Sequence, residues 1–123
     1  MVNIKHLKLA NYFIDKAYDA IGNIADGVDV EKNSKILQQV SDHVCNLGIP
    51  FVAYAYAERI SAIVESEQKP LLNIPKLQKI VEDSNDEELI IRFADEVCGA
   101  DLKSLQSHLP SDKQSKLNKE FGL

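Results

Sequence analysis

The sequence of 123 residues has few of the residues from which catalytic and metal sites are usually built. It contains two cysteines, three histidines and five glycines, and no two glycines are closer than five residues. A glycine-rich phosphate cradle is therefore absent, and so are the CxxC, HExxH and GxSxG motifs of common metal and nucleophile sites. We expect no catalytic residues, no metal and no cofactor. An enzyme with a site assembled from dispersed residues is the least favoured class.

Arginine is also scarce. Arg59 and Arg92 are the only arginines among fourteen basic residues, and the formal net charge of the chain is −5. Phosphate and base recognition favour the forked guanidinium of arginine, and an acidic chain repels a polyanion. The sequence therefore argues against direct binding of nucleic acid.

Long apolar runs are missing as well. The longest uncharged stretch around the apolar centre, residues 44–57, is shorter than the roughly 20 residues that span a bilayer. Residues 1–8 mix charged and polar side chains with apolar ones and contain no signal-peptide core. We expect a cytoplasmic protein with no membrane contact, in which Cys45 and Cys98 are reduced and serve as small structural hydrophobes.

What is present is the composition of a soluble globular domain, with 45% hydrophobic and 27% charged residues. Apolar residues recur at steps of three and four along nearly the whole chain, which predicts an all-α fold. We expect residues 1–123 to form a single compact helical bundle of five to seven helices. Their expected positions are 4–26, 30–47, 50–64, 74–82, 86–98, 101–109 and 111–122.

The helix near residues 50–65 is apolar on nearly every side in its first turns, which is typical of a central helix. The first helix carries a long apolar stripe that we expect to face the core. Gly22 is the one glycine inside a predicted helix, and close helix packing or an early helix end would explain it. The stripe consists of Ile4, Leu7, Ala10, Ile14, Ala17, Tyr18, Ile21 and Ile24.

Acidic residues concentrate in one stretch. Residues 82–101 carry a net charge of −7, while the other 103 residues sum to +2. Some of these acids fall in a helix first turn, where the helix dipole favours them, and a solvated surface is an alternative explanation for the rest. As a functional site, the stretch predicts a docking surface for a basic protein partner. Its acids are Glu82, Asp83, Asp86, Glu87, Glu88, Asp95, Glu96 and Asp101.

Two classes of function follow from these patterns. The first is a non-enzymatic binding or inhibitory protein, such as an immunity protein or antitoxin that neutralises a basic toxin or nuclease. The alternative is a helical adaptor or regulatory domain with an apolar groove lined by Phe51, Tyr54 and Tyr56, although core packing is favoured for Phe51. A homodimer is left open in either case.

Overall fold

The computed structural model describes residues 3–99, and within that range it is all-helical with no strand. The helices expected at 101–109 and 111–122, and Asp101, lie outside the described residues. The elements are α1 (Ile4–Ala25), α2 (Val30–Leu47), α3 (Pro50–Ser61), the 3₁₀ helix η1 (Lys69–Leu72), α4 (Ile74–Asp83) and α5 (Glu87–Glu96).

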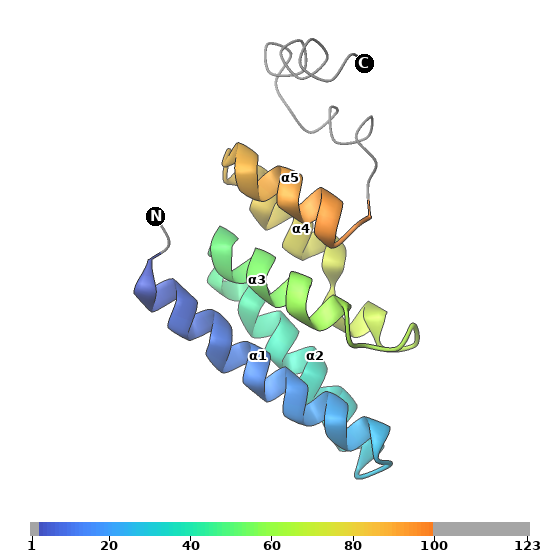
Figure 1. The fold of residues 1–123 in the computed structure, drawn as a ribbon. Helices are drawn as coiled ribbons and strands as arrows, with labels where there is room; N and C mark the ends of the chain where they lie inside the picture. The colour runs from blue at the N-terminus through green and yellow to red at the C-terminus, as the bar shows by residue number, and fades with distance from the viewer. Residues whose placement is uncertain (1–2, 100–123) are drawn as a thin grey trace.

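The central position expected for the third helix is confirmed. Helices α1 and α2 form a long hairpin against one side of α3, while α4 and α5 lie on its other side (Figure 1). Helix α3 contacts each of the other five elements. Its apolar character supplies the core of the bundle through Val52, Ala53, Tyr56, Ala57 and Ile60, all of which are buried.

The helix boundaries follow the signals in the sequence closely. The Asn3 side chain caps α1 by accepting the Lys5 N–H at 2.9 Å. Gly48 ends α2 with φ of +63°, a left-handed conformation that favours glycine, and Pro50 opens α3. These short connections hold α2 and α3 close together in the core.

The third helix is shorter than expected, because α3 ends at Ser61 and not at residue 64. The stretch between the helices expected at 50–64 and 74–82 contains η1, and the Glu65 N–H donates to Gln68 Oε1 at 3.0 Å. Leu72, at the end of η1, is fully buried. Bringing Leu72 back to the core requires the chain to leave the helical path after Ser61, and its burial stabilises the turn by roughly 1.5–3 kcal/mol.

Helix α1 corrects a second expectation. Ile4, Leu7 and Tyr18, predicted to face the core, are 69%, 43% and 42% exposed. Among the described elements, α1 packs substantially on α2 and α3 alone, so only one of its sides is covered. That covered side is built from Ala10, Ile14, Ala17, Ala20 and Ile21.

Gly22 is explained neither by close packing nor by an early helix end. Helix α1 continues to Ala25, and a Cβ built on Gly22 meets no neighbouring atom within 4 Å. This glycine therefore lies in open space on the exposed side of a regular helix. Among residues 3–99, no helix has the length and apolar character needed to cross a membrane.

Candidate functional site

Seven of the eight acidic residues predicted as a docking surface lie on the α4–α5 hairpin, which divides them into groups, and the eighth, Asp101, is outside the described residues. The first group lies near the turn of the hairpin, where Glu82 and Asp83 end α4 and Glu87 and Glu88 begin α5. The second group lies at the far end of α5, about 10 Å further along the helix at 1.5 Å per residue. It consists of Asp95 and Glu96.

Several of these acids already have partners within the hairpin. Asp83 pairs with Lys79 at 3.2 Å, and Glu88 pairs with Arg92 Nη2 at 2.9 Å, each one helical turn apart. All four side chains are more than half exposed, so these pairs contribute little to stability. Gln78 Nε2 donates to Glu82 Oε1 at 3.0 Å. The hairpin therefore carries a weaker field than its formal charge suggests.

Asp86 was predicted as an acid of the docking surface in a helix first turn, and the structure gives it a capping role at that helix end. It is the N-cap of α5, and its Oδ1 accepts the Leu89 N–H at 3.2 Å. Its own N–H donates to Ser84 Oγ at 3.0 Å, which fixes the turn between α4 and α5. The carboxylate keeps acceptor capacity beyond this one bond, because an ionised carboxylate has two oxygens.

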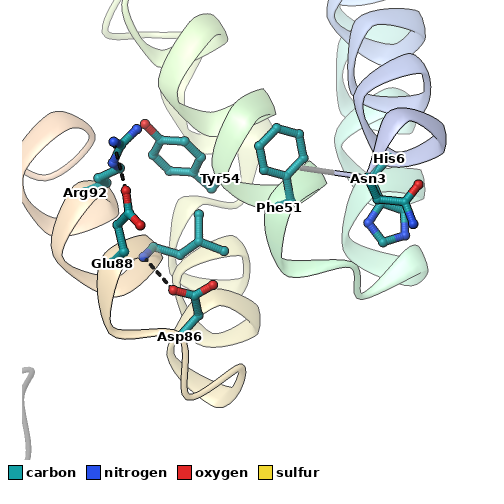
Figure 2. A pocket seen from close by; sticks show the side chains of 8 residues that line it. Asn3, His6, Phe51, Tyr54, Asp86, Glu88 and Arg92 are labelled. Carbon is teal, nitrogen blue, oxygen red and sulfur yellow. Dashed lines mark hydrogen bonds and ion pairs between the residues drawn. The ribbon is translucent and has the colours of Figure 1, made fainter. Parts of the chain in front are cut away.

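A groove of about 430 Å³ opens beside Asp86, where the N-terminal ends of α1, α3 and α5 meet (Figure 2). Phe51, Tyr54 and Leu89 supply apolar surface, and Asp86 and Glu88 supply carboxylates. We call this the α1–α3–α5 groove. Its complete lining is Asn3, His6, Phe51, Tyr54, Asp86, Glu88, Leu89 and Arg92.

The groove corrects two expectations about the aromatic residues. Phe51 is only half-buried and lines the groove, whereas core packing was favoured for it. Tyr56 is fully buried and cannot line a groove. Helix α3 turns by about 100° per residue, so Phe51 and Tyr54 share one side of it while Tyr56 points elsewhere. Of the three aromatics proposed for a groove, two are found there.

Tyr54 joins α3 to α5 at one end of the groove. Its hydroxyl donates to Glu96 Oε2, and Figure 2 shows the same hydroxyl beside the Arg92 guanidinium. Burial first, and then the bond to Glu96, raise the pKa of Tyr54 to about 12. The pKa of Arg92 is raised by its bond to Tyr54 and by the charge of Glu88. Both shifts favour the protonated form of the side chain.

The other candidate chemistries gain no support from the described residues. Within residues 3–99 no group of three or more His, Cys, Asp or Glu side chains is placed to hold a metal ion. Cys45 is buried, as expected of a structural thiol, but Cys98 is exposed. Desolvation, which is only partial at Cys98, raises the pKa of both thiols, and the charge of Glu82 adds to the effect at Cys98. A raised pKa favours the thiol over the reactive thiolate.

Sequence reasoning did not place Asn3 and His6 at this site. Both lie on the first turn of α1 or just before it, more than 40 residues from Phe51 in the chain. Their position follows from how α1 packs on α3, which no local pattern encodes. The sequence feature that bears on their position is the N-cap Asn3, because it fixes the residue at which α1 begins.

The class that these observations define is a small all-α bundle with an open groove beside an acidic helical hairpin. Comparison with known proteins finds no family model, no curated protein and no solved structure that matches this chain. Function is therefore argued from the geometry of the groove.

Proposed function

We propose that this chain is a non-enzymatic protein-binding module whose α1–α3–α5 groove binds a basic segment of a partner protein. An immunity protein or antitoxin that neutralises a basic toxin or nuclease is the class that fits best. The observation that carries the proposal is the convergence of apolar surface from Phe51, Tyr54 and Leu89 with the carboxylates of Asp86 and Glu88. Two of the acids predicted as a docking surface, Asp86 and Glu88, line the same groove as Phe51 and Tyr54, which supports joining the two alternatives considered from the sequence.

The two kinds of surface have different physical roles in this proposal. The acids of the α4–α5 hairpin attract a cationic partner over distances of about a Debye length, roughly 8–10 Å at physiological salt. The field raises the association rate and gives it a strong dependence on ionic strength. Burial of the apolar lining then slows dissociation. Cys45 and Cys98 are free thiols, which supports a cytoplasmic location for such a module.

The proposal is tested by comparing three baits in capture experiments from the native host. The first is the wild-type chain. The second carries Asp86→Asn and Glu88→Gln, which remove two charges from the groove while Asn keeps the N-cap. The third carries Asp42→Asn and Glu67→Gln, which remove two charges at exposed positions outside it.

We expect the wild-type and control baits to capture the same basic protein, and the groove variant to lose most of it. With the captured protein purified, the association rate should fall at least about tenfold between low and high salt for the wild type. The groove variant should show a shallower dependence. Equal capture by all three baits, or equal salt dependence, contradicts the proposal.

A further inference from the structure

The outward side of α1 carries three of the large apolar residues that the described bundle leaves exposed. Ile4, Leu7 and Tyr18 are 69%, 43% and 42% exposed on this side. At 100° per residue, these three and Asn11 fall within an arc of about 60° along the helix. The inner side of α1, by contrast, is built largely from alanines that let α2 and α3 approach. Ile4, Leu7 and Tyr18 are therefore turned away from the core that Ile14 and Ile21 enter.

Charged residues flank this apolar stripe in a segregated order. Lys5 and Lys8 lie beside its N-terminal half, and Asp15 and Asp19 lie beside its C-terminal half, within about 100° of Ile4 around the helix. All four are exposed. Each pair places like charges three or four residues apart, which disfavours an isolated helix.

The order of charges also opposes the helix dipole. Helix α1 has no acid in its first turn and no base in its last turn, so it lacks the charges that the dipole favours at either end. Two of its lysines, Lys5 and Lys8, lie toward the N-terminus, and its acids lie toward the C-terminus. Its third lysine, Lys16, is in the C-terminal half and lies over the Tyr12 ring, 5.1 Å from the ring centroid. Nothing within residues 3–99 pairs with any of Lys5, Lys8, Asp15 or Asp19 as a salt bridge.

We propose that two copies of this chain associate by packing α1 antiparallel against α1 of the second copy through this side. In that arrangement Lys8 faces the partner's Asp15, and Lys5 faces the partner's Asp19. The same register sets Ile4 and Leu7 against the partner's Tyr18. A two-fold axis near residues 11 and 12 generates every contact twice, as in an isologous dimer.

A second copy is the occupant that the charges specify. The surface is complementary to itself only when turned end for end, because each half carries the sign that the other half needs. A parallel pair would place lysines against lysines and aspartates against aspartates. Antiparallel pairing also aligns the two helix dipoles favourably. An unrelated basic or acidic partner would complement only half of the surface.

The dimer surface is separate from the α1–α3–α5 groove. The groove is lined on α1 by His6 and, just before the helix, by Asn3. His6 lies about 160° around the helix from Lys8. The two surfaces face different directions, so dimerisation leaves the groove open and makes the module bivalent. Failure of either proposal leaves the other standing.

The test uses charge variants of the full chain, followed by sedimentation velocity over a range of concentrations. One double variant, Lys5→Glu with Lys8→Glu, makes the α1 surface acidic at both ends. Another, Asp15→Lys with Asp19→Lys, makes it basic at both ends. The matched control, Lys32→Glu with Lys35→Glu, has the net charge of the first variant but changes exposed positions on α2.

We expect the wild type and the control to show a concentration-dependent dimer. Each double variant alone should have a dimer dissociation constant raised by at least about tenfold, and an equimolar mixture of the two should form a heterodimer. The chain carrying all four substitutions should regain self-association, because the charges are exchanged but remain complementary. A parallel dimer would not weaken in the double variants, since its like-charge contacts are already present. Circular dichroism confirms that every variant is folded.

Three results would overturn the proposal. The first is a wild-type chain that stays monomeric at all concentrations, which would leave this side of α1 to another partner or to solvent. The second is a dimer that the double variants form as well as the wild type, which would place the contact on a different surface. The third is the absence of a heterodimer in the mixture.

Discussion

The hydroxyl of Tyr56 lies 2.6 Å from Ser41 Oγ in the buried contact between α3 and α2. Ser41 Oγ is also 3.0 Å from the Leu37 carbonyl, to which it donates its single proton. Tyr56 must therefore be the donor to Ser41. Both side chains are fully buried, and within the described residues no buried side-chain nitrogen or oxygen lacks a partner. The central helix is thus fixed to α2 by a polar contact as well as by packing.

This direction of donation predicts unequal effects of removing the two partners. Ser41→Ala leaves the buried Tyr56 hydroxyl without its acceptor, which should lower the free energy of unfolding by about 1–3 kcal/mol. Tyr56→Phe leaves Ser41 bonded to Leu37 and should cost about 0.5–1.5 kcal/mol. Urea denaturation of both variants measures the difference. A larger loss from Tyr56→Phe would mean that the donor is Ser41.

The tyrosines of α3 also predict how stability changes in alkali. Burial is the main cause that raises the pKa of both Tyr54 and Tyr56 to about 12, compared with about 10 in an unfolded chain. Between these values the unfolded chain loses protons that the folded chain keeps, so unfolding becomes more favourable as pH rises. The contribution is fully present below about pH 10 and is lost as pH approaches 12. Urea midpoints measured across this interval should fall.

A control separates this effect from general alkaline repulsion. In the chain carrying Tyr54→Phe and Tyr56→Phe, the fall in urea midpoint above about pH 10 should be smaller, because the two groups with raised pKa values are gone. The near-ultraviolet absorbance of tyrosinate should show the corresponding loss of late-titrating groups. An identical pH profile for the variant and the wild type would rule out this linkage.

Local signals predicted most of the fold because they act within a few residues. The cap Asn3, the left-handed Gly48 and Pro50 set the ends of three helices where the sequence placed them. The apolar character of α3 on nearly every side also identified it as central, and periodicity identified the apolar stripe on α1. What it could not decide was which side of α1 is covered. The stripe on α1 is wider than one contact can bury, and only the positions of α2 and α3 determine that Ile4 and Tyr18 are exposed.

The candidate site was predictable in its parts but not in its assembly. The acids of α5 and the aromatics Phe51 and Tyr54 were each singled out from the sequence. That Tyr54 reaches Glu96, 42 residues away, depends on the packing of α5 against α3. A single sequence carries no record of such long-range contacts, so the groove emerges only from the structure.

The N-cap of α5 predicts that two substitutions of Asp86 that remove the same charge have different effects on stability. Asp86→Ala removes the acceptor of the Leu89 N–H and should lower the free energy of unfolding by about 0.5–2 kcal/mol. Asp86→Asn keeps a good cap and should change it by much less. Both variants remove the same charge, so both should weaken binding of a basic partner alike. Thermal unfolding compares their stabilities. Equal destabilisation by Asn and Ala would show that the charge, and not the cap, stabilises this turn.

Gly22 and Gly27 lie only five residues apart and predict opposite responses to alanine. Gly22 lies in the exposed interior of α1 with open space where a Cβ would be, so Gly22→Ala should stabilise the chain by about 0.8–1 kcal/mol. Gly27 follows the end of α1 with φ of +74°, which strains any residue with a Cβ. Gly27→Ala should therefore destabilise it, by roughly 1 kcal/mol or more. Denaturation of both variants at low concentration, where the monomer predominates, gives the two values. A destabilising Gly22→Ala would mean that the glycine is needed for a contact that the bundle over residues 3–99 does not itself supply.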